Sequence, residues 1–503
     1  MQQADLFAVG SLLGVEMEMA VAHREHGDSR HVNRYFAALA QIHHDRNGVP
    51  TPLWVGGRCT GIQTAQAVCG LDNGLNLLET ALFPVSEQEG GLAELARRLH
   101  QELADTLCAL RDDDLVVLNA SQHPACSRDA RWYARTRLPR PIYDELARRG
   151  CRHDQGIDAK AQNGANTAIP IDMAAQAVNV GLAIIAPASI ALFGNSPLEA
   201  GRATGLKETR LTLWPRMFGP SRHAGDLHLC EYPARPFADL ADYFMWMFGP
   251  PTVSRSLSLH DEHDYKSGVA MYLEGSPSLH AFLQADSWPA RRHDTGEALM
   301  VTASARHFVH AQVLMLLDSR LRYRLPHLPD IRDLRDAWQL PGGMEALFKA
   351  CGAEAYLEGR AAGANFVDAV LLEQVDASVA SSVIVAPSAL QLGLLRQLPA
   401  CLALIEEWGW DRLGALRERA IRDGLDDPEL VRLCSQVLAL AHDGLREDER
   451  HWLRYAEHVL FSGVSSADRL LQSWNDGPAH ASARLERTVQ QHAAVHPGLF
   501  FEG

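Results

Sequence analysis

Two glutamates stand one residue apart in an otherwise apolar run, GVEMEMAVA, at residues 14–22. Side chains alternate along a β-strand, so Glu16 and Glu18 would share one face of the strand, and the apolar residues would share the other. Carboxylates about 7 Å apart on one face repel unless protons, basic side chains or a cation compensate them. The pattern leaves two interpretations open: the polar outer face of a surface strand, or half of a divalent-metal site.

Three further charged side chains stand in strand-like contexts. Glu79 follows an Asn-Gly turn in NLLETALFP, and Glu358 and Arg360 stand two apart in AYLEGR, on one strand face. Carboxylates that converge from separate strands suit Mg²⁺ or Mn²⁺, which prefer oxygen ligands. Each glutamate has an ordinary alternative as the charge partner of a neighbouring strand. Considered together, the acids favour a metal site.

Basic residues gather in GRATGLKETRLTLWPR, residues 201–216, around a glycine-containing loop: Arg202, Lys207, Arg210 and Arg216. Beside a metal site these cations would neutralise a transferring phosphate, with Arg supplying bidentate contacts. A solvated surface loop is the alternative. Phosphoryl transfer depends on positioning and charge neutralisation, so it needs no Ser–His–Asp or Cys–His arrangement.

Several segments occur in a fixed order along nearly the whole chain: GVEMEM, NLLETALFP, ANTAIPIDM, ALFGNSP, GRATG, TRLTLW, YLEGR and GVSSADRLLQSWNDG. This series resembles the glutamate–cysteine ligases of the plant and proteobacterial type, including the actinobacterial enzymes of the ergothioneine branch. Those enzymes belong to the glutamine-synthetase-like carboxylate–amine ligase superfamily. The resemblance implies an α+β fold, with a curved antiparallel sheet that forms a funnel-shaped site flanked by helices.

The same resemblance implies a chemistry and a set of site residues. Mg²⁺ (or Mn²⁺) would bridge the phosphates of ATP, which would convert the γ-carboxylate of glutamate into an acyl phosphate for an amine to attack. The implied metal ligands are Glu16, Glu18, Glu79 and Glu358. Arg210 and Arg360 would be catalytic, stabilising the phosphoryl group or the substrate carboxylate. Binding of ATP, phosphate or substrate falls to Lys207, Arg202, Asn76 and Trp214.

Two departures from the family pattern affect the acceptor half of the site. Relatives carry polar, metal-facing residues where this chain has Ala168 and Pro170. Pro cannot ligate a metal or donate to a sheet ladder, which predicts a change at the strand edge or the metal site. Residues 326–354 replace a compact segment that usually runs almost straight into Tyr-Leu-Glu. These departures fit a ligase with an altered substrate.

Composition bounds the class of protein. The chain has 503 residues, 47% of them hydrophobic, and a net charge of −15, which argues against general nucleic-acid binding. Nine scattered cysteines without CxxC spacing argue against a disulfide framework or a zinc site and favour a reducing cytosol. The N-terminus lacks the positive region of a signal peptide. Residues 174–193 approach membrane-spanning length, but Gln176, Asn179 and Pro187 favour a buried core helix.

Local patterns predict the main elements. Two apolar runs separated by Asn73-Gly74 predict a hairpin, leucines at helical spacing predict a helix over 91–111, and residues 165–173 read as a strand. Helical periodicity dominates from about 385, and Ser465 or Ser466 is a plausible cap for a helix near the end. We expect a catalytic domain over 1–384 and a helical C-terminal portion over 385–503 packed on it.

The sequence therefore predicts a cytoplasmic, ATP-dependent ligase that joins a glutamate-like acid to an amine, with cysteine as the default amine. Its partners would be amino-acid substrates and ATP, with no nucleic acid and no membrane. A catalytically weakened relative that binds nucleotide or amino acid as a regulator is the alternative. The amine, the acid and the oligomeric state are left open.

Overall fold

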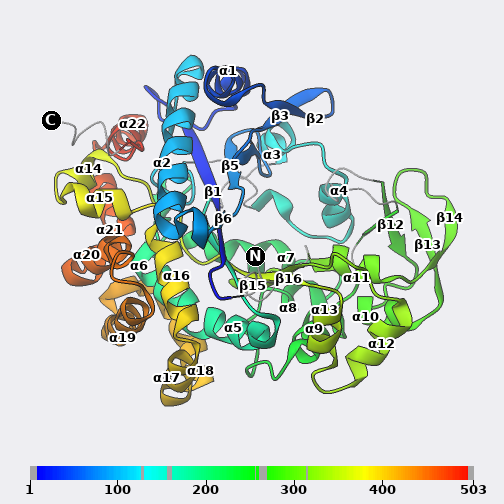
Figure 1. Cartoon of the computed structure of the whole chain (residues 1–503). Helices are drawn as coiled ribbons and strands as arrows, with labels where there is room; N and C mark the ends of the chain where they lie inside the picture. The colour runs from blue at the N-terminus through cyan, green and yellow to red at the C-terminus, as the bar shows by residue number, and fades with distance from the viewer. Residues whose placement is uncertain are drawn as a thin grey trace.

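A large antiparallel sheet forms the centre of the protein. The computed structural model describes residues 8–125, 130–155, 161–254, 256–259, 269–312 and 315–496 (Figure 1). The sheet has ten strands in the order β15-β16-β8-β1-β5-β4-β3-β2, and β6 and β7 also pair with β1. Its strands are β1 Leu12–His23, β2 Thr51–Val55, β3 Arg58–Gln63, β4 Ala67–Leu71, β5 Leu77–Leu82, β6 Val85–Ser86, β7 Leu115–Val117, β8 Asn163–Ala168, β15 Ser319–Arg324 and β16 Glu354–Gly359. The expected mixed α+β class with an antiparallel sheet is confirmed.

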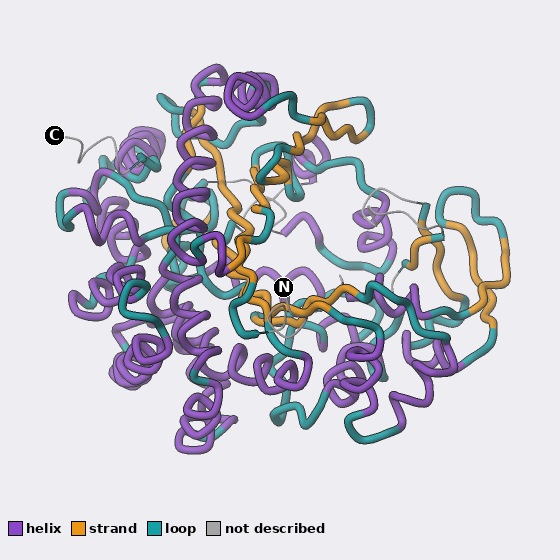
Figure 2. The backbone as a smooth tube through the Cα atoms, viewed as in Figure 1, coloured by secondary structure: helices purple, strands orange, loops and turns teal. Residues whose placement is uncertain are grey.

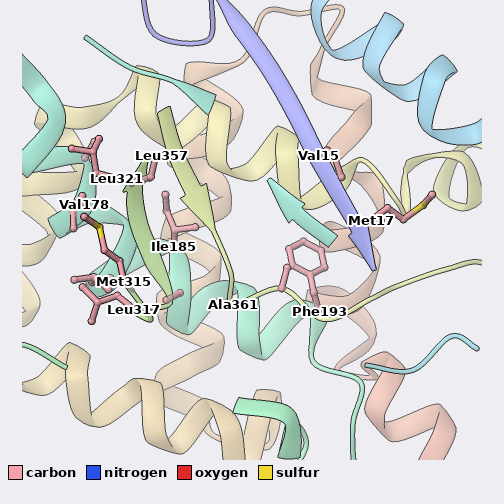
Figure 3. Close-up of a cluster of buried hydrophobic side chains, with 14 of the residues drawn as sticks. Val15, Met17, Val178, Ile185, Phe193, Met315, Leu317, Leu321, Leu357 and Ala361 are labelled. Carbon is pink, nitrogen blue, oxygen red and sulfur yellow. The ribbon is translucent and has the colours of Figure 1, made fainter. Parts of the chain in front are cut away.

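Strand β1 lies in the middle of this sheet, between β5 and β8. Its odd-numbered residues Val15 and Met17 are buried in an apolar cluster with Leu321 and Leu357 (Figure 3). Period-two alternation places Glu16 and Glu18 on the opposite face, as predicted. Burial of these apolar side chains determines which way the glutamates point. A shift of one residue in the strand register would bury the acids in the core.

The predicted hairpin is strands β4 and β5, joined by residues 72–76 and paired with Leu71 opposite Leu78. The strand expected over 165–173 is shorter than predicted. It ends at Ala168, and a 3₁₀ turn, Ile171–Met173, follows Pro170. Pro170 has no N–H to continue the ladder, which is consistent with the early end of the strand.

Helices surround the sheet, and the predicted helix over 91–111 is α2 (Figure 2). Those before residue 385 are α1 Tyr35–Asn47, α2 Gly91–Ala109, α3 Ala130–Thr136, α4 Pro141–Arg148, α5 Ala174–Val180, α6 Ala186–Phe193, α7 Leu213–Phe218, α8 Gly225–His228, α9 Leu240–Phe248, α10 Leu279–Gln284, α11 Ala305–Ala311, α12 Ile331–Gln339, α13 Gly343–Ala350, α14 Ala369–Leu372 and α15 Ala377–Ser382. Residues 326–354, which stand where the family pattern has a compact segment, contain α12 and α13.

The apolar stretch after β8 is one helical run in which a π-helical turn, Gly181–Ile185, joins α5 to α6. Ile171–Phe193 is long and apolar enough to cross a membrane, but 94% of its most apolar window is buried inside the protein. This is the burial expected of a core helix. A Cβ on Gly181 would meet Ser319 Oγ at 2.2 Å, so the run packs closely against the start of β15.

The remaining part of the chain is helical from Ala386 onward, with α16 Ala386–Arg396, α17 Leu398–Trp408, α18 Trp410–Asp423, α19 Pro428–Gly444, α20 Arg454–Ser462, α21 Ser466–Asn475 and α22 Ala481–Gln491. Ser465 caps α21 in a capping box with Asp468, as the sequence indicated. Helix α16 packs on β8, where Gln391 donates to the carbonyl oxygens of Ala165 and Leu357. Whether residue 385 divides two domains stays a prediction.

Two smaller sheets complete the fold. The first pairs β9 Leu198–Glu199 with β10 Arg202–Ala203, and the second contains β11 Leu257–Ser258, β12 Ala270–Leu273, β13 Ser287–Arg292 and β14 Ala298–Thr302. The four-stranded sheet lies on the side of the molecule opposite the C-terminal helices (Figure 1). Six of the cysteines within the described ranges are free thiols, Cys59, Cys69, Cys108, Cys351, Cys401 and Cys434, and Cys126 lies outside those ranges.

Candidate active site

Strand register brings the four predicted acids onto one face of the sheet. Glu18 lies directly opposite Glu79 on β5. On the other side of β1, Gly14 lies opposite Asn166 of β8, which in turn lies opposite Glu358 of β16. Residues opposite one another in antiparallel strands point to the same face. Glu16, two residues after Gly14, therefore shares that face.

Three arginines join this face from strands at its edge. Arg320 of β15 lies opposite Glu358, and its guanidinium contacts both carboxylate oxygens at 2.9 and 2.8 Å. Arg360 reaches Oε1 of the same carboxylate at 2.9 Å, and Arg322 lies 3.6 Å from Oε2. The predicted pair of Glu358 and Arg360 thus exists, although β16 ends one residue before Arg360.

Glu16 lies in surroundings that disfavour a negative charge. Burial, together with the charges of Glu358 and Glu79, raises the pKa of Glu16 to about 7. Arg320 and Arg322 oppose this shift without cancelling it. An ionised Glu16 is therefore costly until positive charge arrives on this face.

Glu358, unlike Glu16, lies in surroundings that favour its ionised form. Its burial favours the neutral acid, but the charges of Arg320, Arg360 and Arg322 hold the pKa of Glu358 well below its ordinary value. Only 1% of Glu358 is exposed. It is a permanent carboxylate in a buried ion-pair network, whereas Glu16 lacks comparable compensation.

Asn166 is a site-face residue that the sequence reasoning missed. Its Oδ1 is buried and accepts no hydrogen bond from the part of the chain that the structure describes. A neutral oxygen in this position suits a hard cation or an ordered water. Arg320 and Arg322 were missed as well. The only signal for them was the alternation in SRLRYR, residues 319–324, which repeats the pattern of GVEMEM with bases in place of acids.

The departures at Ala168 and Pro170 have different consequences in the structure. Ala168 lies opposite Tyr356, so it is on the site face and offers a methyl group there. Pro170 lies beyond the end of β8, before the 3₁₀ turn. The altered residue on the site face is therefore Ala168.

Among the predicted basic residues after residue 200, Lys207 and Arg216 form ion pairs of their own. Lys207 forms ion pairs with Asp426, at 2.8 Å, and with Asp468. Arg216 makes two contacts of 3.1 Å with Glu199. Arg202 is exposed on β10. Trp214, also among the predicted binding residues, lies near Arg360, whose guanidinium is 5.8 Å from the Trp214 ring centroid.

Asn76 lies in the β4–β5 connection, away from the basic loop. Its side-chain amide donates to Ser29 Oγ at 2.6 Å, and the side chain is 2% exposed. The expected roles of Asn76, Lys207, Arg202 and Trp214 in binding stay predictions.

Arg210 is buried and ties the basic loop to the end of β16. It donates to Glu208 at 2.7 Å and to the carbonyl oxygens of Arg360 and Ala361 at 3.1 and 3.0 Å. Glu208 is fully buried and also accepts the Asn195 N–H at 2.7 Å. Arg210 thus anchors the backbone at Arg360, and the catalytic roles expected of Arg210 and Arg360 stay predictions.

We expect Arg210→Ala to lower the free energy of unfolding by about 3–5 kcal/mol, because it leaves the Glu208 carboxylate buried without its ion pair. Activity should fall too, since the backbone at Arg360 loses its anchor. Thermal melts and kcat/KM measure the two effects. The matched control is Arg202→Ala, whose exposed side chain predicts a change within about 0.5 kcal/mol. An unchanged melt for Arg210→Ala would contradict the positioning role.

A comparison with protein families finds a match for the first part of the chain. Residues 12–244 match the model of glutamate–cysteine ligase family 2. This region belongs to glutamate–cysteine ligase family 2. The match includes Glu16, Glu18, Glu79 and Arg210, and it ends before Glu358. The family assigns the chain to ATP-dependent ligases that form an amide bond. No curated protein sequence matches the chain.

Two solved structures are similar over nearly the whole length of this chain. Glutamate–cysteine ligase from Francisella tularensis in complex with AMP has 12% identity and a TM-score of 0.48, covering 99% of this chain and 90% of its own. A bifunctional glutathione synthetase from Pasteurella multocida has 10% identity and a TM-score of 0.43, covering 97% of this chain and 52% of its own. At these TM-scores neither likeness bears on the roles of individual residues.

Proposed function

We propose that this protein uses ATP to activate the γ-carboxylate of glutamate, or of a similar acid, and joins it to an amine, with cysteine as the default amine. The observation that carries the proposal is the convergence of Glu16, Glu18, Glu79 and Glu358 with Arg320, Arg322 and Arg360 on one sheet face. A metal–nucleotide complex carries a cation and negatively charged phosphates. Glutamates beside arginines suit both, because the carboxylates can bind the cation and the guanidinium groups can bind the phosphates.

Mg²⁺ or Mn²⁺ fits the donors on this face. Glu16, Glu18 and Glu79 are the acids that would hold it, and the unsatisfied Asn166 Oδ1 offers a neutral oxygen. The raised pKa of Glu16 marks negative charge that a cation would compensate. Glu358 stays a predicted ligand that would share its carboxylate with its arginine partners. When bound, the ion neutralises phosphate charge.

The arginines supply the fixed positive charge of the proposed site. Arg360 is held in place by Glu358 on one side, at 2.9 Å, and by its backbone N–H, which donates to Asp318 at 2.8 Å. Such preorganised cations stabilise charge on a transferring phosphoryl group without moving during the reaction. Ala168 leaves an apolar spot near them, which favours an acceptor or acid different from the substrates of relatives with a polar residue there.

The test is ADP release with Mg-ATP and glutamate across a panel of amines that begins with cysteine, with products identified by mass spectrometry. A γ-glutamyl amide is the expected product, and the panel names the amine. Tight nucleotide binding with no ADP released for any acid or amine would overturn the proposal in favour of a regulatory, catalytically weakened relative.

The proposal includes a cytosolic location and a division of the chain into a catalytic domain, 1–384, and a helical portion, 385–503. The free thiols at Cys59, Cys69, Cys108, Cys351, Cys401 and Cys434 are compatible with a reducing compartment.

A further inference from the structure

A second cluster of chemically reactive side chains lies on the other face of the sheet. His43 of α1, Cys69 of β4 and Glu102 of α2 each offer one atom, and these three atoms lie within 4.8 Å of one another. Cys69 lies opposite Thr80 in the register, next to the pair Gly70 and Glu79, so it points away from the acids described above.

The three side chains are among the most buried polar groups of the protein. His43, Cys69 and Glu102 are 3%, 0% and 1% exposed. His43 Nε2 lies 3.5 Å from the Glu102 carboxylate, which raises the pKa of His43, whereas Nδ1 has no hydrogen-bond partner among the described residues. Buried imidazoles normally have both nitrogens satisfied, so a buried ring with an unpartnered Nδ1 is unusual as a purely structural histidine.

Two of the three distances match those between ligands of one metal ion. Glu102 Oε2 lies 3.5 Å from His43 Nε2 and 3.5 Å from Cys69 Sγ. Metal–ligand bonds of about 2.0–2.3 Å in a tetrahedron separate N from O by about 3.3 Å and S from O by about 3.5 Å. A metal ion therefore fits among these atoms after small side-chain adjustments.

We propose that His43, Cys69 and Glu102 bind a divalent transition metal of the zinc type. One nitrogen, one sulfur and one oxygen ligand favour such an ion over Mg²⁺ or Ca²⁺, which take oxygen ligands. On binding, the Cys69 thiol loses its proton to solvent, and sulfur and carboxylate then ligate the ion. Thr80, which lies opposite Cys69 and whose hydroxyl is buried, or a water supplies the fourth ligand.

The surroundings support a structural role for this metal. The three ligands come from three different elements, so the ion would tie α1 and α2 to the strand next to β5. A neighbouring ion pair, Arg46 with Asp105 at 2.5 Å, already links the same two helices. The metal would hold β4 and β5 in register behind Glu79, without contact with ATP or substrate.

Metal content of the full-length protein tests the proposal independently of activity. The protein is stripped with a chelator, reloaded with Zn²⁺, freed of unbound metal and analysed by mass spectrometry. We expect about one tightly held Zn²⁺ per chain in wild type and in Cys434→Ala, a control at an equally buried cysteine. Cys69→Ala and His43→Gln should each retain about tenfold less. Equal zinc in Cys69→Ala and wild type would overturn the assignment.

Cobalt spectroscopy keeps the test decisive if a variant fails to fold. Co²⁺ added to the stripped wild-type protein should produce a thiolate-to-cobalt charge-transfer band and visible bands of tetrahedral coordination. Zn²⁺ should displace the cobalt, and the melting temperature should rise with added Zn²⁺. The proposal would be overturned if Co²⁺ gave the wild-type protein no charge-transfer or tetrahedral band and Zn²⁺ did not raise its melting temperature. This holds whatever the variants do. Zinc content and cobalt spectra do not depend on ATP turnover. A failure of the metal proposal can therefore be distinguished from a failure of the proposed ligase function.

Discussion

Replacing Glu16 by glutamine is expected to abolish Mg²⁺-dependent ATP turnover while stabilising the metal-free protein at neutral pH. Activity should fall about 10²–10³-fold or more, because the variant removes a charge that is placed to hold the cation. Stability should rise because Glu16 is an acid in surroundings that disfavour its ionised form. Its pKa is raised to about 7 by burial and by Glu358 and Glu79. If Glu16 were only a polar residue on a surface strand, its replacement would change neither ATP turnover nor stability.

The stability effect of Glu16 has a defined pH window. The native protein binds the Glu16 proton more tightly than the unfolded chain, whose pKa is near 4.5. The contribution to stability is therefore complete below about pH 4.5 and is lost as pH rises through about 7. The advantage of Glu16→Gln over wild type should grow across this window to on the order of 2–3 kcal/mol. Chemical denaturation of both proteins at a series of pH values, in chelator, measures it.

The response of the melting temperature to Mg²⁺ also distinguishes wild type from Glu16→Gln. Added Mg²⁺ should raise the melting temperature of wild type at pH 8, where Glu16 is ionised, and have little effect on Glu16→Gln. The control is Glu25→Gln, an exposed position just beyond β1, which should behave as wild type in activity, pH dependence and Mg²⁺ response. A Glu16→Gln protein that unfolds, or that turns over ATP normally, would exclude the metal-ligand role.

Glu358→Gln should also abolish activity but, unlike Glu16→Gln, should destabilise the protein by about 3–5 kcal/mol. The variant leaves Arg320 and Arg360 buried without the carboxylate that both contact. Because the pKa of Glu358 is held below its ordinary value, the stability it provides is present above about pH 4.5 and is lost on acidification. The difference between variant and wild type should therefore shrink at low pH.

The matched control for this second variant lies on the same strand. Glu354→Gln, at the exposed start of β16, breaks an ion pair with exposed Arg324 and should cost less than about 1 kcal/mol. Denaturation curves of the three proteins give the comparison. If Glu358→Gln were as stable as Glu354→Gln, the ion-pair network would not anchor this side of the site.

Local patterns in the sequence determined the elements whose signals are local. Alternation in GVEMEM determined that Glu16 and Glu18 share a strand face, because the side-chain period of two is a property of the strand itself. The Asn-Gly turn determined the β4–β5 hairpin, and Ser465 with Asp468 determined the start of α21, because turns and caps depend on a few adjacent residues. Of the candidate site, the sequence predicted its acids and Arg360.

Tertiary structure alone decided which strands are neighbours and which charges compensate one another. Placing β15 next to β16 brings Arg320 to Glu358, a pairing between residues 38 positions apart that no local pattern encodes. The placement of β8 between β16 and β1 made Asn166 part of the site. Long-range packing likewise buried Arg210 against the chain after Arg360 and paired Lys207 with Asp426 and Asp468. The physical reason is that register and burial depend on contacts formed when distant segments pack together, whereas the strand period is present in every segment alone.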